Sequence, residues 1–348
     1  MSGAQTVHRA RRLADDLLFP AAVQVDSTGR LPVELLDTLA AQGFYALGGL
    51  PEWSPPSIPD AATHAAVIEA FAGGCLAAAF VWRQHVGALG ALVRGENARL
   101  RTDLGPLLAS GELRSGLAIG AATRVGPPSV RARRDRDGWL MTGTAPWFTG
   151  WGLVGVMLLA GRDQDDQLVL ALVDLDDPAI SADPMHLLAV QAGNTVTLQI
   201  SSLSVPDERV VRVEPHARYL DRDAESLVAN GFLATGVAGR AIALQDEPDD
   251  ARDALLGELR QVRAGLLNAD AAGAPSARAA SSELAVRAAA RLAVHQGARS
   301  VLAGSHADRL LREAALLLTF GTRPGIRDRL LQRLAGSGAA GSGAEPVG

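Results

Sequence analysis

The sequence lacks lysine altogether and holds a single cysteine among its 348 residues. Because every positive charge is therefore an arginine, a Schiff base on a lysine side chain is excluded. The lone Cys75 excludes a disulfide within the chain and a zinc site built on several cysteines. The 7 histidines never pair at helical spacing with a carboxylate between them, so the sequence predicts no metal centre.

Long apolar runs and export signals are also absent. No run reaches the ~18 apolar residues that span a bilayer, and the first residues lack the apolar core of a secretory signal. We therefore predict a soluble, cytoplasmic protein. A formal net charge of −5 favours neither nucleic acid nor an anionic membrane as a partner.

What the sequence does contain is 48% apolar and 20% charged residues, a globular composition. Its length predicts two or three subdomains. Residues 1–113 show helical periodicity, as in Leu35, Leu36 and Leu39. A long apolar helix is expected over about 61–93, where the Gly73-Gly74-Cys75 interruption indicates close helix packing.

After residue 113 the period of the apolar pattern changes. Residues 114–212 alternate with a period of two between Gly and Asp turns, which predicts five to seven strands in an antiparallel barrel or sandwich. Residues 213–335 return to helical periodicity and predict a bundle. Residues 336–348 are a low-complexity tail that we expect to be disordered. The fold class is therefore α+β and multidomain: helices, an antiparallel β-domain, then a helical bundle.

The segment Gly138–Gly152, called here the tryptophan segment, holds three of the 5 tryptophans. Its glycines and proline predict a strand, a tight turn and a second strand. Trp147, Phe148 and Thr149 are of most interest, because an aromatic wall beside a hydroxyl donor suits a planar ring with polar edges. Taken alone, the pattern favours the alternative of a plain hairpin core with a buried tryptophan.

Other motifs have plain interpretations. The arginines 131, 133, 134 and 136 could grip phosphate, but their alternation favours the solvated face of a strand. His85 could line a pocket, and a buried, hydrogen-bonded histidine is the favoured alternative. The Gly-x-Gly-x-x-Gly match from Gly336 follows no strand and opens no helix, so it lacks the context of a nucleotide site. No Gly-x-Ser-x-Gly elbow supports an α/β-hydrolase.

Five strings stand in one order along the chain. Their ranges are Gly29–Phe44, Pro51–Glu52, Asp137–Gly150, Leu203–Val210 and Leu311–Ala314. Together with the helix–β–helix plan, they resemble the acyl-CoA dehydrogenase family of flavoproteins. The Asp137-Gly-Trp-Leu-Met-Thr-Gly run and its Trp147-Phe-Thr continuation are similar to a family hairpin. The resemblance spans roughly residues 10 to 334.

The resemblance implies an FAD whose flavin ring lies against the β-domain, and a CoA thioester or related small molecule as substrate. In that family the Trp-x-Thr of the hairpin borders the flavin, which corresponds to Trp147 and Thr149 with Phe148 between them. A second flavin-contacting strand corresponds to residues 118–122, where Gly120 keeps a backbone N–H but brings no hydroxyl. The expected cofactor-binding residues are thus Trp147, Phe148, Thr149 and Gly120.

The part of the family's site that carries the catalytic base is altered in this sequence. The family takes a substrate proton with a glutamate in Tyr-Glu-Gly-Thr, and the counterpart here is Phe320, which cannot accept a proton. Some members carry the base early in the first C-terminal helix, where Glu225 is a weak catalytic candidate and a carboxylate favoured by the helix dipole is the alternative. Glu313 is expected to be structural. The arginine motif that grips the cofactor across a family dimer is absent near Gln245.

Three functions therefore stay open. The first is a flavin-dependent oxidoreductase on an acyl thioester or related small molecule. The second is a non-catalytic or half-catalytic subunit of a heteromeric acyl-CoA dehydrogenase. The third is a reduced-flavin monooxygenase on the same fold, assisted by His85 or Ser226. Family habit and the alanine-rich helix faces predict a homodimer, a homotetramer or a heteromer with a related subunit.

Overall fold

The computed structural model describes residues 2–53, 60–245 and 249–336, apart from the side chains of residues 224–226. The expected tail is thus outside the described residues beyond Gly336. The N-terminal part is helical, as predicted. Its elements are α1 (Gly3–Leu13), a π-helical turn η1 (Ala14–Leu18), α2 (Phe19–Thr28), α3 (Val33–Ala41), η2 (Phe44–Ala46), α4 (Ala61–Gly74), α5 (Leu76–Val93) and α6 (Ala98–Ser110).

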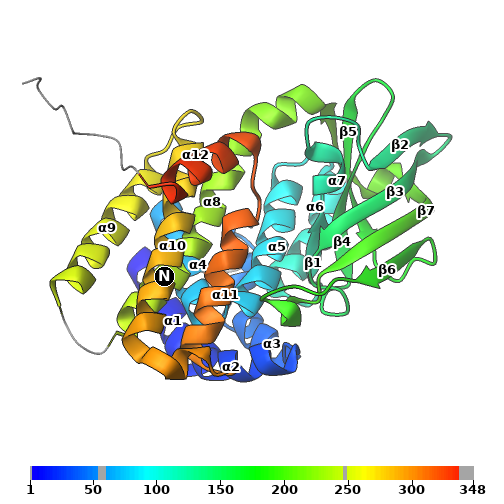
Figure 1. The fold of residues 1–348 in the computed structure, drawn as a ribbon. Coiled ribbons are helices and arrows are strands. Elements are labelled where there is room, and N and C mark those ends of the chain that lie inside the picture. The colour runs from blue at the N-terminus through cyan, green and yellow to red at the C-terminus, as the bar shows by residue number, and fades with distance from the viewer. Residues whose placement is uncertain (1, 54–59, 246–248, 337–348) are drawn as a thin grey trace, which may run out of the picture.

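A single eight-stranded sheet follows in the described part of the chain. Its elements are β1 (Ser115–Ala118), α7 (Gly120–Thr123), β2 (Val130–Asp135), β3 (Gly138–Phe148), β4 (Val156–Arg162), β5 (Gln167–Asp174), β6 (Ile180–Pro184), η3 (Gln191–Gly193), β7 (Val196–Pro206), η4 (Asp207–Arg209) and β8 (Val210–Pro215). The strand order is β6-β7-β3-β2-β4-β5-β8, with β1 beside β4. The sheet lies to one side of the helices in Figure 1.

The sheet is mixed rather than purely antiparallel, which corrects the prediction. β1 pairs parallel with β4, from Ser115 opposite Val156 to Ala118 opposite Leu159. Parallel neighbours need a crossover connection, and here the chain from β1 passes through α7 and the β2–β3 hairpin before β4. The alternating pattern that predicted strands carries no information about strand direction, because antiparallel and half-buried parallel strands both alternate.

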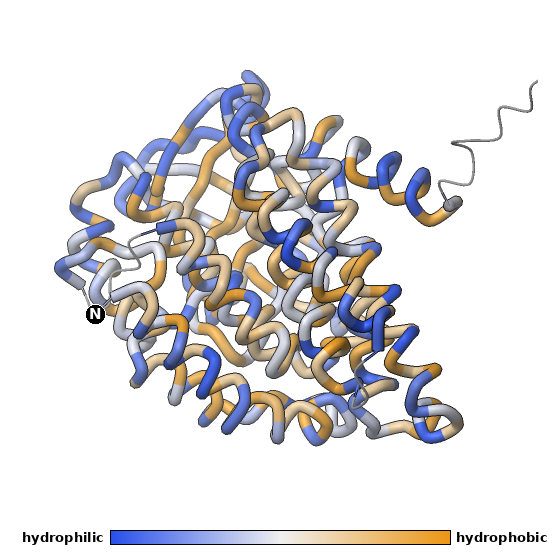
Figure 2. Tube along the Cα trace, turned by 90° about the vertical axis from the view of Figure 1, so that its left-hand side faces the viewer, coloured by the Kyte–Doolittle hydropathy of each residue, from blue (hydrophilic) through white to orange (hydrophobic). Residues whose placement is uncertain are grey.

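The C-terminal part is a helical bundle around α8, as predicted. Its elements are α8 (His216–Ala243), α9 (Asp250–Leu267), α10 (Ala274–Gln296), η5 (Gly297–Val301), α11 (His306–Thr319) and α12 (Pro324–Leu334). Figure 1 shows α8 and α10 running beside α4 and α11. Polar and apolar stretches alternate along the helices in Figure 2, because each amphipathic helix turns one face to the shared core. The predicted domain boundaries fall next to β1 and α8 and stay a prediction.

The helix expected over 61–93 is two helices that meet at Cys75. Cys75 has an extended backbone, which ends α4 and begins α5. The two preceding glycines permit close packing on both sides. A Cβ on Gly73 would lie 2.9 Å from the carbonyl oxygen of Gly236 on α8, and one on Gly74 would lie 2.8 Å from Leu18 Cβ. The close packing predicted from these glycines is confirmed.

Cys75 is expected to resist thiol reagents in the folded protein. It is buried, and burial raises the pKa of its thiol to about 11. Only the thiolate reacts, so roughly one thiol in a thousand is reactive at pH 8. A disulfide reagent such as DTNB should leave native protein almost unlabelled and label one thiol per chain in urea. Rapid labelling of native protein would contradict this placement.

Two described helices, α5 and α8, are long and apolar enough to cross a membrane by length and composition alone. Most of each apolar window is buried inside the protein, 72% for α5 and 65% for α8. The core helix of a soluble protein meets the same two criteria. The cytoplasmic location stays a prediction from the sequence.

Candidate functional site

The tryptophan segment is one bulged strand rather than the predicted strand, turn and second strand. β3 runs without a break from Gly138 to Phe148, between β2 and β7. Gly143, which suggested a turn, serves a close approach instead, since a Cβ there would lie 2.0 Å from the carbonyl oxygen of Ser129. Glycine is used for both purposes, which is why the sequence pattern alone did not distinguish them.

Trp147 stands at a bulge near the end of β3. The register shifts between Ala145 and Phe148, so two residues of β3 lie opposite one residue of β7. Trp147 has φ +67°, a left-handed conformation that is an outlier for a bulky residue and costs about 1–3 kcal/mol. Its side chain is 55% exposed. Backbone strain that keeps a large aromatic ring in solvent is typical of a ligand-binding residue.

The other two tryptophans of the segment behave differently. Trp139 is buried, 8% exposed, under the guanidinium of Arg134. Trp151 packs partly buried against the core inside the sheet. The alternative of a hairpin core with a buried tryptophan therefore describes Trp139, whereas Trp147 is turned outward by the bulge.

Thr149 follows the bulge and is buried. Its Oγ1 lies 3.0 Å from Oγ1 of Thr195, and either oxygen can donate. One hydroxyl hydrogen joins the pair, which leaves the second hydrogen for a third group. Two backbone hydrogen bonds fix the turn behind the pair. The N–H of Gly150 donates to the carbonyl oxygen of Gly193, 2.8 Å, and the N–H of Trp151 donates to the carbonyl oxygen of Asn194, 3.2 Å. The sequence analysis missed Thr195, whose only signal was its place at the start of an alternating run.

Phe148 joins the tryptophan segment to the strand that leads to Gly120. Phe148 is fully buried, and a Cβ on Gly116 of β1 would lie 2.5 Å from its ring and 3.1 Å from the Thr149 carbonyl oxygen. β1 therefore crosses close beside the end of β3. Gly120 opens α7 just beyond, and a Cβ there would have nothing within 4 Å. The backbone at Gly120 is thus open to a ligand, whereas Phe148 supports the wall from inside.

A buried polar cluster fixes the segment that carries Gly120. Arg162 of β4 donates from Nη1 to Nδ1 of His216, 2.5 Å, and from Nη2 to the carbonyl oxygen of Gly126. His216 in turn lies 3.0 Å from the carbonyl oxygen of Thr123 through Nε2. Because the guanidinium must donate, the histidine accepts at Nδ1 and donates from Nε2. The cluster ties α7 to the sheet and to the start of α8.

Phe320 caps α11 and packs against α5. Its ring centroid lies 4.3 Å from that of Phe80. Its carbonyl oxygen accepts a 3.0 Å bond from Nη2 of Arg278, which also donates to Leu317. Arg278 is 1% exposed, and burial lowers its pKa to about 10. The residue after Phe80, Val81, lies near Gly150 and Gly193, so α5 separates Phe320 from the buried side of the Thr149 turn.

No protein-family model matches the chain. A Mycobacterium leprae protein named "Probable acyl-CoA dehydrogenase fadE25" is 28% identical over 210 residues, 58% of this chain and 54% of the relative. The solved glutaryl-coenzyme A dehydrogenase glutaryl-CoA complex has TM-score 0.83 at 18% identity, covering 96% of this chain and 95% of that one. This chain is similar to acyl-CoA dehydrogenases in both sequence and fold.

The similarity extends over the whole fold, not only over the matched sequence. PigA with FAD and proline has TM-score 0.80 at 18% identity, covering 96% of this chain and 97% of that chain. The sequence match is shorter than the structural match. The chain spans about half the length of the curated relatives it matches. The predicted order of helical domain, β-domain and helical bundle is thus the order of acyl-CoA dehydrogenase folds.

The remaining predicted residues of this acyl-CoA dehydrogenase-like chain have mixed outcomes. Glu225 and Ser226 lie in α8, but their side chains are outside the described residues, so the role of Glu225 stays a prediction. His85 is fully buried and accepts a 3.2 Å bond at Nδ1 from the N–H of Ser115. Burial lowers the pKa of His85 to about 3. The structure therefore supports the buried-histidine interpretation.

Two further interpretations concern charged residues. Arg131, Arg133 and Arg134 of β2 are exposed, and Arg134 pairs with Asp207, so the structure supports the interpretation of solvated arginines. Glu313 forms a buried ion pair with Arg309, N···O 2.7 Å, with side chains 5% and 1% exposed. A fully buried pair inside α11 is structural, as expected from the sequence.

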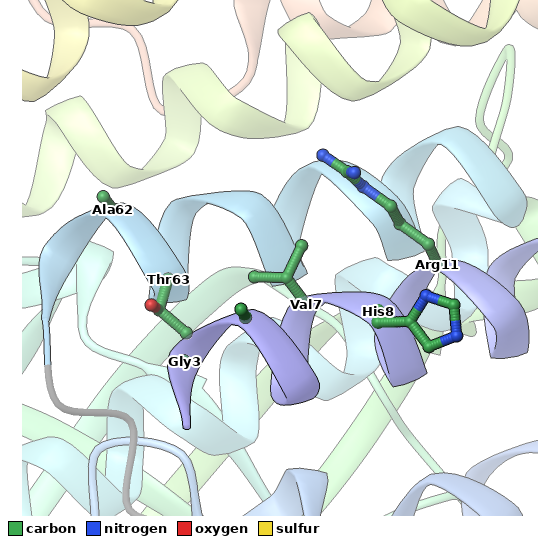
Figure 3. Close-up of a pocket in the computed structure, with 7 residues that line it drawn as sticks. Gly3, Val7, His8, Arg11, Ala62 and Thr63 are labelled. Carbon is green, nitrogen blue, oxygen red and sulfur yellow. The ribbon is translucent and has the colours of Figure 1, made fainter. Parts of the chain in front are cut away.

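A surface pocket of about 380 Å³ lies elsewhere, between the start of α1 and the start of α4. Figure 3 shows Val7, His8 and Arg11 of α1 along one side and Ala62 and Thr63 on the other. In Figure 1, α1, which lines most of this pocket, lies among the helices on the side away from the sheet. It contains none of the residues predicted to contact a cofactor, so the candidate site is the end of β3 with β1 and α7.

Proposed function

We propose that this protein is a flavin-dependent oxidoreductase that binds FAD at the end of β3 and acts on an acyl thioester or a related small molecule. The single observation that carries the proposal is Trp147, held by a strained bulge with 55% of its side chain in solvent. An exposed aromatic ring in a costly conformation needs a partner, and a flat ring system is one. The curated relatives named acyl-CoA dehydrogenases support the same class.

The residues present fit a flavin on three counts. Trp147 offers a flat wall, and the open backbone at Gly120 lets a ring approach. The Thr149–Thr195 pair keeps one hydroxyl hydrogen for a polar edge. When bound, FAD supplies the two-electron acceptor that no side chain of this chain provides. The chain's own residues then hold the ring, orient its polar edge and exclude water on the Phe148 side.

The first experiment is the absorption spectrum of the purified protein. We expect bands near those of free FAD in the visible region, either as purified or after FAD is added and excess removed. The spectrum should change when butyryl-CoA or crotonyl-CoA is added. Colourless protein that takes up neither FAD nor FMN would overturn the proposal.

Replacing Trp147 with alanine should weaken FAD binding about tenfold or more, because the stacked ring is lost. Trp147→Phe keeps an aromatic face and should retain most of the affinity. The matched control is Val301→Ala, which truncates an 81% exposed apolar side chain in η5, away from the sheet. Binding is measured by fluorescence quenching of added FAD. Equal FAD affinity in Trp147→Ala and the parent would place the flavin elsewhere.

One observation favours a second candidate within this class. The sequence resemblance assigns the position of the family's glutamate to Phe320, whose ring packs on Phe80 and whose carbonyl oxygen accepts a bond from the buried Arg278. Neither the ring of Phe320 nor its hydrogen-bonded carbonyl oxygen can accept a substrate α-proton. This arrangement favours chemistry that needs no such base, such as a reduced-flavin monooxygenase. Oxygen consumption by the reduced protein would support that candidate, and anaerobic bleaching of the flavin by an acyl-CoA would exclude it.

A heteromeric assembly is the remaining alternative for the missing base. If a partner subunit supplies the carboxylate, co-expression with a related dehydrogenase subunit should give a stable complex that bleaches on addition of acyl-CoA. A homo-oligomer that dehydrogenates acyl-CoA alone would exclude this arrangement.

A further inference from the structure

Arg83 is a cation without a counter-charge. It lies on α5, and its Nε is shielded from solvent and has no hydrogen-bond partner. Among the residues that the structure describes, none forms an ion pair or hydrogen bond with its side chain. The buried guanidinium groups among the described residues have partners. Arg309 pairs with Glu313 and Arg162 with Asp166, whereas Arg278 donates to backbone carbonyl oxygens. A donor nitrogen that is shielded from solvent and lacks a partner is costly unless something else supplies an acceptor.

The groups that affect the pKa of Arg83 do not supply a negative charge. Burial, and next the positive charge of Arg94, lower the pKa of Arg83 to about 10. Burial, and next Arg83 itself, lower the pKa of His64 on α4 to about 4, so His64 is neutral at pH 7. The Nε2 atom of His64 is also buried without a partner. The Nε–H of Arg83 therefore lacks an acceptor, and an anion is a group that would satisfy it.

The guanidinium of Arg83 lies over a glycine beside β1. A Cβ on Gly87 would stand 3.6 Å from Nη1 of Arg83 and 2.8 Å from Cδ1 of Leu117. Gly87 thus lets α5 approach β1 closely and brings the Arg83 guanidinium beside the strand that leads to Gly120. Arg83 is only partly buried, so an anion can reach its planar donors from solvent.

This place adjoins the proposed flavin site. Phe80, Arg83 and Gly87 share one face of α5, because residues three, four and seven apart align on a helix. Phe80 contacts Phe320, at the position of the family's base. Arg83 stands one turn further along, at about 5 Å of axial rise. An anion on Arg83 would therefore lie one helical turn from the Phe80–Phe320 pair.

We propose that Arg83 binds a carboxylate of the substrate, so that the substrate of the flavin site is an acid. Either a free carboxylic acid or an acyl thioester with a second, terminal carboxylate has this chemistry. The planar guanidinium accepts a carboxylate through two parallel N–H···O bonds, which a thioester or an alkyl chain cannot form. This inference rests on the proposed function, because it takes the flavin site as the place where the substrate reacts.

The test compares ligand pairs that differ by one carboxylate. Glutaryl-CoA and valeryl-CoA share a five-carbon acyl chain, and valerate and its amide, valeramide, share a five-carbon chain in the same way. Calorimetry measures the affinity of the purified protein for each. We expect the carboxylate-bearing member of one pair to bind about 10-fold to 100-fold more tightly. A preference within the CoA pair identifies a thioester substrate, and a preference for valerate over valeramide alone identifies a free acid.

Arg83→Met should remove that preference and leave affinity for the member without the carboxylate, valeryl-CoA or valeramide, unchanged. Arg83→Lys, which keeps the charge but not the planar fork, should keep part of it. The matched control is Arg99→Met on α6, where an 86% exposed arginine is removed from a surface pair. Arg83→Met should also raise the melting temperature of ligand-free protein, since it removes an uncompensated charge. A merely structural arginine would lower it.

The outcomes separate this inference from the proposed function. Yellow protein that shows no preference in either ligand pair, or whose Arg83→Met variant keeps the preference, overturns the inference and leaves the flavin site standing. Colourless protein with an Arg83-dependent preference overturns the flavin proposal and leaves the carboxylate site standing.

Discussion

Glu313→Ala is expected to lower the free energy of unfolding by about 3–5 kcal/mol. Glu313 and Arg309 form an ion pair one turn apart on α11, with both side chains almost completely buried. Removing the carboxylate leaves Arg309 buried, with a 3.3 Å contact to His306 among its remaining polar neighbours. An uncompensated charge in that position costs far more than the pair contributes. Chemical denaturation followed by circular dichroism measures the change.

The control is the double variant Arg309→Met/Glu313→Met, which removes both charges and keeps similar volume. Its stability should lie within about 1 kcal/mol of the parent or above it, because the desolvation of two ions is no longer needed. Burial raises the pKa of Glu313, with Arg309 opposing the shift, so Glu313→Gln, which stays uncharged, should cost less than Glu313→Ala. If single and double variants lose the same stability, packing rather than charge holds this part of α11.

The sequence predicted most of the fold because its periodicities are strong. The change from helical to two-residue alternation marks β1 close to residue 113, and α12 begins at Pro324 as its proline indicates. The parallel pairing of β1 with β4 could not be predicted, because the direction of a strand depends on contacts between strands and not on the alternation of apolar residues. The break at Cys75 was visible only as two glycines and an alanine-rich face.

The site was predicted in residue type but not in geometry. Trp147, Phe148 and Thr149 follow one another in the sequence, yet one is exposed and two are buried. That division depends on the bulge, which a single extra residue opposite β7 creates. Arg83 gave no sequence signal, since an arginine on an apolar helix is ordinarily paired or solvated. Its lack of a partner is visible only once α4, α5 and β1 are placed together.

The second large effect is expected at the crossing of α4 and α8. Gly236 of α8 lies so close to α4 that an added Cβ would stand 2.4 Å from the carbonyl oxygen of Glu69 and 2.9 Å from Cβ of Ala72. Gly236→Val must therefore push the two helices apart, because a backbone oxygen cannot turn aside as a flexible side chain can. We expect a loss of about 3 kcal/mol or more. Cys75, at the end of α4, should then react with DTNB in the native protein.

Gly265→Ala supplies the matched control for that experiment. Gly265 also lies in a helix, α9, but a Cβ there would meet nothing within 4 Å. The added methyl should raise stability by about 0.5–1 kcal/mol, because alanine loses less backbone entropy than glycine in a helix. We expect Gly236→Val to lower the denaturation midpoint and expose Cys75, and Gly265→Ala to raise the midpoint and leave Cys75 unreactive. This result would show that the close approach of α4 and α8 stabilises the helical core beneath α5. If both variants change stability and Cys75 reactivity equally, α4 and α8 can move apart at little cost. The placement of Phe80, Val81 and Arg83 would then not depend on this crossing.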